Sequence, residues 1–465
     1  MSEKEEAATK QSFPRSFWTA NVTELFERGA YYAMASFMVL YLGQLGLGNY
    51  WPSFLSSTVL WSLVYFLPIL SGTIADHVGF KRSLLVAFVL LAIGYFLMGY
   101  PVWLGGHTLS KIVESEVSVG SDVVITVLIA ILLIGMGGSV IKPCISGTVK
   151  KTSGLRATLA FGIFYMVINI GSLFGRGISY FTRKQFDLSY IFAVSVCFSI
   201  VAFFVVLFFY RDVEKEPGYA PPAQVEKKSQ RSIGRILLDM FVVLKNPRFS
   251  LFLLVMSGFW FIYSQVYNVI PLYLKKVVEL DPAVDVITMA NPFVIVFFQL
   301  LITKMFGKLK PIVSIIIGGL IISLSMIVNI VPIFLTEGIR SGTFIKILPM
   351  GSLFAVFTVA MIAFGELFAA ARQFEYIGAL SPKGQEGLFL GYANLPMAIG
   401  SFFGGFGGAY IFNDIMCKGA TKMPNGLLEL NPKWNALGWF ILMSIGLVSA
   451  FFLVLYNRWL RNNPA

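Results

Sequence analysis

Apolar runs bounded by charged or turn-forming residues recur along the whole chain. A first set falls at about residues 20–44, 53–74, 83–103, 122–148, 157–181 and 188–210, and a second at about 249–275, 284–306, 311–335, 345–376, 387–413 and 435–457. Each run approaches or exceeds the roughly 20 residues with which an α-helix crosses a bilayer. The pattern predicts an all-α polytopic membrane protein with twelve transmembrane helices.

A polar segment separates the two sets of six. Residues 211–235 read RDVEKEPGYAPPAQVEKKSQRSIGR, which is charged, contains proline and is poor in large hydrophobic residues. Such a composition is typical of a linker. We therefore expect a cytoplasmic N-terminal tail at 1–19, an N-terminal six-helix bundle at 20–210, a cytoplasmic linker at 211–248, a C-terminal six-helix bundle at 249–457 and a cytoplasmic C-terminal tail at 458–465.

Composition supports the membrane assignment. Of the 465 residues, 57% are hydrophobic and 13% are charged, and the mean hydropathy is +0.76. The formal net charge of +12 is not accompanied by any nucleic-acid-binding motif. Most of the Lys and Arg residues fall on one side if the N-terminus is inside the cell, as the positive-inside rule requires. We expect a multi-pass protein of the cell membrane that contacts lipid, binds no nucleic acid and has both termini in the cytoplasm.

The sequence offers little for enzyme or metal chemistry. Its three cysteines, Cys144, Cys197 and Cys417, lie far apart, and its two histidines, His77 and His107, have no metal-ligand spacing. No nucleophile-base arrangement or phosphate-binding loop is visible. We expect no enzymatic activity, no metal and no cofactor.

The first apolar run contains three charges. In TELFERGAYY (23–32), Glu24, Glu27, Arg28 and Tyr31 stand at i, i+3, i+4 and i+7, which places them on one helix face. A charge at the centre of a span costs about 2.5–3.5 kcal/mol or more, so such groups usually face the protein interior. We expect Glu24 to pair with Arg28, which leaves Glu27 as a second carboxylate able to take up a proton. The alternative is a static salt bridge that stabilises the first helix.

Further charges occur in other runs. Lys142 precedes Pro143 in the fourth run, Arg176 lies in the fifth, and Glu366 lies in the tenth. Lys142 and Glu366 are too far inside their runs for their charges to reach the membrane surface easily. They are candidate groups of an internal polar site.

The short connection between the second and third runs carries a recognisable motif. GTIADHVGFKR (72–82) resembles the Gly-x-x-x-Asp-x-x-Gly-x-Lys-Arg signature of the major facilitator superfamily, and the layout of six plus six helices resembles that fold. The resemblance implies a major facilitator fold, in which Asp76 and Arg82 would belong to a conformational gate.

Motifs in several spans resemble one branch of that superfamily, the proton-coupled oligopeptide transporter (POT/PTR) family. The first-helix signature of that family, Glu-x-x-Glu-Arg-Phe-x-Tyr-Tyr, is matched by Glu24, Glu27, Arg28, Tyr31 and Tyr32, although Gly29 replaces the phenylalanine. Other matching segments are YFLPILSGTIAD (65–76), IKPCIS (141–146), FYMVINIGSL (164–173), FW (259–260) followed by Gln265, ANPFVI (290–295) and FGEL (364–367). The chain looks like a divergent member of the family.

The resemblance implies proton-coupled symport of di- and tripeptides, or peptide-like zwitterions, by alternating access. Glu24, Glu27 and Arg28 would handle the proton, which is the coupling ion. Lys142 would pair with Glu366 or hold the substrate carboxylate, while Glu366 would receive the substrate ammonium group. The pocket would be lined by Tyr31, Tyr32, Tyr65, Asn169, Trp260, Gln265 and Asn291. Arg372 and Glu375, nearer the cytoplasmic end, would act in gating.

Two alternatives stay open. One is a proton-coupled facilitator for another small organic solute or a drug, for which carboxylates alone would suffice if the solute is a cation. The other is a nutrient sensor that binds without transporting. A monomer is expected from the resemblance to this superfamily.

Overall fold

The computed structural model describes residues 12–111, 119–215, 244–335, 338–342, 348–380 and 392–462. This part of the chain is almost entirely helical. Its only named strands form an antiparallel hairpin, in which β1 (Thr421–Lys422) pairs with β2 (Leu428–Glu429).

The first half forms six membrane-length segments, called the N-terminal bundle. The segments are α2 (Arg15–Ala35) with α3 (Met38–Gln44); α4 (Trp51–Ser53), the π-helical η1 (Phe54–Trp61), α5 (Ser62–Phe66) and α6 (Pro68–Val78); α7 (Phe80–Trp103); α8 (Ser121–Ser153); α9 (Ala157–Gln185), which follows the turn η2 (Gly154–Arg156); and α10 (Tyr190–Phe209). The second segment bends by 41° just before Pro68, where the ring cannot continue the helix hydrogen bonds.

The second half forms six more segments, called the C-terminal bundle. They are α12 (Pro247–Ser264), η4 (Gln265–Tyr267), α13 (Val269–Tyr273) and η5 (Leu274–Val278); α14 (Val284–Thr288) and α15 (Ala290–Phe306); α16 (Pro311–Ser325) and η6 (Met326–Ile333); α17 (Met350–Leu380); α19 (Leu395–Tyr410) and η7 (Ile411–Met416); and α20 (Pro432–Asn462). Asn246 caps α12 by accepting hydrogen bonds from the backbone N–H groups of Arg248 and Phe249.

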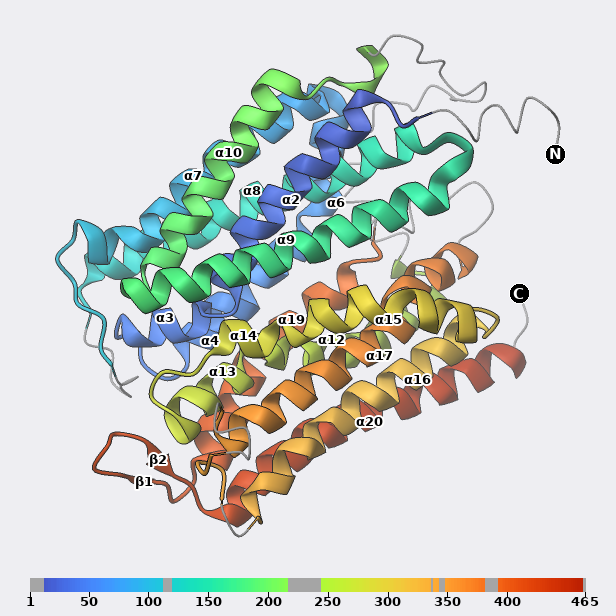
Figure 1. The fold of residues 1–465 in the computed structure, drawn as a ribbon. Helices are drawn as coiled ribbons and strands as arrows, with labels where there is room; N and C mark the ends of the chain where they lie inside the picture. Colours follow the sequence, from blue (N-terminus) through green and yellow to red (C-terminus); the bar gives the residue numbers. More distant parts are fainter. Residues whose placement is uncertain are drawn as a thin grey trace.

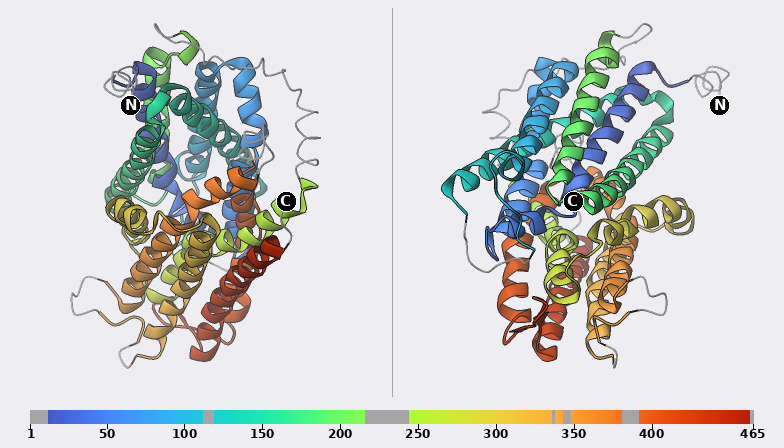
Figure 2. Two further views of the ribbon diagram at one scale, coloured as in Figure 1. Left: turned by 90° about the vertical axis from the view of Figure 1, so that its right-hand side faces the viewer. Right: turned by 60° about the vertical axis from the view of Figure 1, so that its left-hand side comes forward.

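The two bundles lie side by side along one interface. Figure 1 shows the N-terminal bundle, coloured blue to green, above the C-terminal bundle, coloured yellow to red, and the views in Figure 2 agree. The start of α2 and the end of α20 lie at the same end of the molecule. The opposite end carries the connections 45–50, 186–189, 279–283 and 417–431 and is called the distal end below.

The helices are suited to a membrane. Ten in the described chain are long and apolar enough to cross one, and the bent pair Trp51–Phe66 with Pro68–Val78 would make an eleventh. The remaining expected span corresponds to α2 and α3, and α2 is less apolar because it contains four charged residues. The predicted count of twelve is approximately confirmed, and the protein is a multi-pass membrane protein.

Side chains are distributed as they are in a protein solvated by lipid. Large apolar side chains such as Leu300 and Phe208 are 81% and 69% exposed, whereas Glu24, Arg176 and Gln265 are completely buried. Polar groups avoid hydrocarbon because unpaired hydrogen-bonding groups there are costly. The interior is therefore where the functional chemistry is to be sought.

The helix ends differ somewhat from the expected boundaries. Helix α2 already begins at Arg15, and α20 continues to Asn462, so both extend into the segments expected as tails. The expected boundaries follow the continuous apolar runs, although a helix can continue with polar and charged residues on its solvated face. Most of the expected linker lies outside the described residues; within it, η3 (Val213–Lys215) forms a single turn.

Candidate functional site

The charged residues of α2 form one buried group. Arg28 donates a hydrogen bond from Nη2 to Glu27 Oε1 over 2.6 Å and another from Nε to Glu27 Oε2. Glu24 Oε1 lies 3.4 Å from Arg28 Nε, and neither oxygen of Glu24 has a hydrogen-bond partner. The expected Glu24–Arg28 ion pair is therefore present, but Arg28 is hydrogen-bonded to Glu27 rather than to Glu24, which is the less compensated carboxylate. A planar guanidinium satisfies one carboxylate with two parallel bonds, and that arrangement outweighs a single longer contact.

Aromatic rings surround these charges. The Arg28 guanidinium lies 5.1 Å from the ring centre of Tyr31 and 6.0 Å from that of Tyr32. Lys142 of α8 lies 5.6 Å from the ring centre of Tyr65. These distances are those of cation–π contacts. The structure thus brings together the charged residues of the first and fourth spans and the three predicted tyrosines.

Glu366 lies across the bundle interface, on α17. It accepts a hydrogen bond of 2.9 Å from Asn291 Nδ2 of α15. The expected ion pair with Lys142 is not formed in this structure, although both residues are described and their charges interact electrostatically. The reason is geometric, since the ammonium lies over Tyr65 and the carboxylate is held by Asn291. The interface therefore presents a cation on the N-terminal bundle and a carboxylate on the C-terminal bundle.

Three other predicted pocket residues have different surroundings. Asn169 bonds the carbonyl of Tyr165 on its own helix, and Trp260 donates to Gln373 of α17 over 2.9 Å. Gln265 is completely buried and donates to the carbonyls of Phe261 and Gly404. It therefore packs between α12 and α19 inside the C-terminal bundle rather than at the interface, a position that depends on tertiary packing and not on the local motif.

The predicted gating residues lie within single bundles. Gly79 of the loop motif has φ +94°, and the backbone N–H of Lys81 donates to Asp212 after α10. Asp76 and Arg82 are exposed at this corner. Arg372 bonds Glu375 and the carbonyl of Gly307, which joins α17 to the end of α15. The contacts that Arg372 makes with described residues therefore stay within the C-terminal bundle.

An ion cluster connects the bundles at the distal end. Arg183 of α9 donates to both carboxylate oxygens of Asp285 on α14, over 2.8 and 3.0 Å, and to Asp281 over 2.9 Å. Lys184 also pairs with Asp281. Partial burial raises the pKa of Asp281, but the hydrogen bond from Lys184 and the charge of Arg183 outweigh it and hold that pKa below its usual value. Arg183, Lys184, Asp281 and Asp285 are called the distal ion cluster below.

Hydrogen bonds extend this connection toward the middle of the molecule. The hydroxyl of Thr58 donates to Phe402 O over 2.7 Å, and that of Ser62 to Ala398 O over 3.1 Å. Close helix contact permits these bonds, since a Cβ at Gly405 would lie 2.2 Å from Thr58 Oγ1. The inter-bundle bonds found between described residues thus run from the distal end to about the level of Ser62.

The sequence alone does not predict the distal ion cluster. Its cations follow the fifth apolar run, and its carboxylates lie just before the eighth run and at its start. Arg183 and Asp285 are 102 positions apart, and no local spacing relates them. One signal in the sequence points to the cluster. Basic residues at the end of the fifth span and acidic residues at the start of the eighth have opposite charges, and a fold of two six-helix bundles places both span ends on the same side of the membrane.

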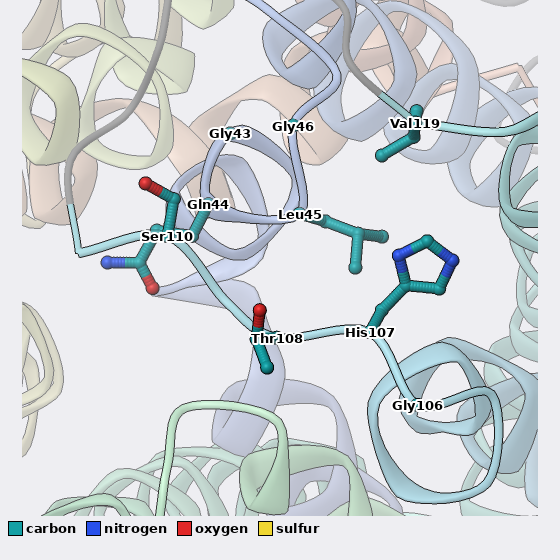
Figure 3. A pocket seen from close by; sticks show the side chains of 9 residues that line it. All are labelled: Gly43, Gln44, Leu45, Gly46, Gly106, His107, Thr108, Ser110 and Val119. Carbon is teal, nitrogen blue, oxygen red and sulfur yellow. The ribbon is translucent and has the colours of Figure 1, made fainter.

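A separate pocket lies in the distal connections of the N-terminal bundle. Figure 3 shows it between the end of α3 and the segment after α7, with the imidazole of His107 and the side chain of Leu45 on its wall. Its volume is about 470 Å³, and its lining residues are Gly43, Gln44, Leu45, Gly46, Gly106, His107, Thr108, Ser110 and Val119. It contains none of the charged residues described above.

Comparison with known proteins gives a consistent result. The sequence pattern of the Major Facilitator Superfamily matches residues 25–405. Dipeptide and tripeptide permease B of Aeromonas hydrophila is 27% identical over 213 residues, which are 45% of this chain and 39% of that protein. Dipeptide and tripeptide permease A of Edwardsiella piscicida is 28% identical over 232 residues, 48% of this chain and 43% of that protein. The matched segment thus spans about two fifths of these relatives' own length.

Solved structures extend the likeness to nearly the whole chain. A peptide transporter POT in complex with sulfate has a TM-score of 0.72 at 18% identity and covers 98% of both chains. A POT family transporter in complex with a thioalcohol-conjugated peptide has a TM-score of 0.73 at 18% identity and covers 96% of both chains. At this identity the likeness establishes the fold.

Proposed function

Because the chain belongs to the Major Facilitator Superfamily, we propose that it is a proton-coupled transporter of di- and tripeptides that works by alternating access. Support for transport comes from the two-bundle fold and from buried charges at the bundle interface. In a membrane protein such charges mark solute or ion pathways. Support for peptides comes from the permease names of the relatives and from the site itself.

The observation that carries the peptide assignment is the placement of Lys142 and Glu366. A peptide is a zwitterion whose terminal charges need a cation at one end and an anion at the other. Lys142 would bind the terminal carboxylate and Glu366 the terminal ammonium, while neutral groups such as Tyr65 and Asn291 would bond the backbone amides. Because Lys142 and Glu366 do not form an ion pair with each other, both charges are available to a solute in this conformation.

The charged residues of α2 would bind and release the proton that is coupled to transport. Glu24 is buried without a hydrogen-bond partner, so its charge is the least compensated of the group. A proton on Glu24 or Glu27 would weaken the hold on Arg28 and let the guanidinium attract the solute carboxylate. Solute and proton would then be bound together, as symport requires.

The distal ion cluster would close one side of the pathway. In the proposed orientation both termini are cytoplasmic, and the distal end faces outward. The bonds of Arg183 to Asp285 and Asp281 would hold that side shut, and breaking them would let the bundles rock apart. The structure would then represent a state closed to the outside.

Counterflow tests this proposal without assuming a driving force. The purified protein in liposomes loaded with unlabelled dialanine should take up labelled dialanine, and trialanine should compete better than free alanine. Absence of counterflow by folded protein would contradict the transport proposal. Binding of dialanine in a thermal-shift assay without counterflow would instead favour a sensor.

A further inference from the structure

Arg176 of α9 is a completely buried cation between the two bundles. Its Nε donates to Thr288 Oγ1 over 3.1 Å, its Nη2 donates to the hydroxyl of Tyr267 over 2.9 Å, and its Nη1 bonds Ser172. The guanidinium carbon also lies 4.4 Å from the ring centre of Tyr32. All of these partners are neutral.

Arg176 differs from two other buried arginines, Arg28 and Arg183, in having no ion-pair partner among the described residues. Among described residues, Arg28 bonds Glu27 and Arg183 bonds Asp285, but no carboxylate lies within ion-pair distance of Arg176. A guanidinium has five N–H groups, and the three bonds above leave two of them without a hydrogen-bond partner in the described chain. Burying a charge without an opposite charge is costly, so an anionic partner would stabilise this site.

Arg176 lies between the candidate solute site and the distal ion cluster. Asn169, Arg176 and Arg183 are seven residues apart on α9, so they follow one face at intervals of about two turns. Tyr32, a candidate pocket residue, lies between the guanidinium groups of Arg28 and Arg176. A solute that enters from the distal side would meet Arg176 before it reaches Lys142 and Glu366.

Two of the hydroxyl partners belong to the C-terminal bundle. Thr288 ends α14 and Tyr267 ends η4, whereas Ser172 lies on α9 itself. When the bundles separate at the distal end, the bonds to Thr288 and Tyr267 must break. The guanidinium would then face the opening with most of its donors free.

We propose that Arg176 binds an additional anionic group of the solute, and that it makes the transporter select peptides with an acidic side chain. The inference rests on the proposed function and adds a specificity residue to it. The side-chain carboxylate of an entering peptide would replace Thr288 and Tyr267 as the partner of Arg176. If Arg176 only connects the bundles, its replacement would affect all peptides alike.

The test compares two peptides of matched size, Ala-Glu and Ala-Gln. In proteoliposomes, the ratio of their uptake efficiencies (kcat/KM) should exceed 1 for the wild type. Arg176→Gln should lower this ratio by about tenfold or more, the scale of a charge-assisted hydrogen bond. Arg176→Lys should restore much of it. Tyr267→Phe, which removes a partner but keeps the cation, should leave the ratio near that of the wild type.

Each other outcome is decisive. A ratio that Arg176→Gln leaves unchanged, even with slower transport of both peptides, would overturn the inference. If Arg176→Gln does not fold, the wild type still tests the inference. Equal competition by Ala-Gln and Ala-Glu against the uptake of labelled dialanine would also overturn the inference. If the wild type takes up neither these peptides nor dialanine, the proposed function itself fails, and the inference falls with it.

Discussion

Arg28 bonds Glu27, its neighbour in the chain, through two guanidinium nitrogens, although Glu24 occupies the position one helical turn away. The single cation thus compensates one of two buried carboxylates strongly and the other weakly. Such an arrangement can exist in two forms, with Arg28 held by Glu27 or released toward a solute. It gives a structural basis for coupling a proton to the movement of an anionic group.

Contact between α16 and α17 should depend on two glycines. A Cβ at Gly318 would lie 2.5 Å from the carbonyl oxygen of Gly365, directly before Glu366. Gly318→Ala should therefore destabilise the protein by about 1–3 kcal/mol, as overpacked substitutions do, and lower its thermal unfolding temperature. Gly162→Ala on α9 is the control, because nothing lies within 4 Å of that site. Equal unfolding temperatures for the two variants would disprove the close contact.

The distal ion cluster should keep the distal side closed. Asp285→Asn leaves Arg183 without its main buried counter-ion, and disruption of a buried pair costs about 3–5 kcal/mol. In a background without native cysteines, Ser36→Cys places a thiol at a buried site that contacts Thr288. A membrane-impermeant maleimide should label this thiol about tenfold faster or more when Asp285→Asn is present.

A matched control for this labelling is Glu214→Gln. Glu214 of η3 pairs with Lys151 near the end of α8, away from the distal end. This substitution also removes one charged partner but should leave the labelling rate near its starting value. A similar rise in both variants would indicate general loosening rather than opening of a gate.

The distal ion cluster should tolerate mild acid. The pKa of Asp281 lies below its usual value in the folded protein. The stability that its charge contributes is therefore fully present above the unfolded-state pKa of about 4, and it is lost only as the pH falls through the lower folded-state pKa. Asp281→Asn should therefore lower the unfolding temperature by the same amount at pH 7.5 and pH 5.5. A difference between wild type and variant that disappears at pH 5.5 would refute this assignment.

Lys142 and Glu366 should recognise opposite ends of a peptide. Glu366→Gln should raise the KM for dialanine by roughly tenfold to a hundredfold, the scale of a charged hydrogen bond, and should remove the preference for dialanine over its N-acetyl form. Lys142→Gln should instead remove the preference for dialanine over its C-terminal amide. Competition for labelled peptide uptake measures both preferences, and the same pattern for both variants would contradict the assignment.

The sequence was informative wherever the determining interactions are local. Apolar runs predicted the spans, and the spacing of Glu24, Glu27 and Arg28 placed them together because one helix fixes their positions. The choice of Glu27 as the main partner of Arg28 depends on side-chain conformation, which spacing does not specify. Gln265 could not be placed because its neighbour Gly404 comes from a distant helix. The pairing of Arg183 with Asp285 depends on how the two bundles meet.

The central claim is that the carboxylates of α2 couple a proton to peptide movement. The most direct measurement is accumulation of labelled dialanine in liposomes with and without an inward proton gradient, for the wild type, Glu24→Gln, Glu27→Gln and the control Glu214→Gln. We predict gradient-driven accumulation by the wild type and the control, and its loss in Glu24→Gln and Glu27→Gln, with counterflow retained. Accumulation that survives in both of these variants would contradict the account.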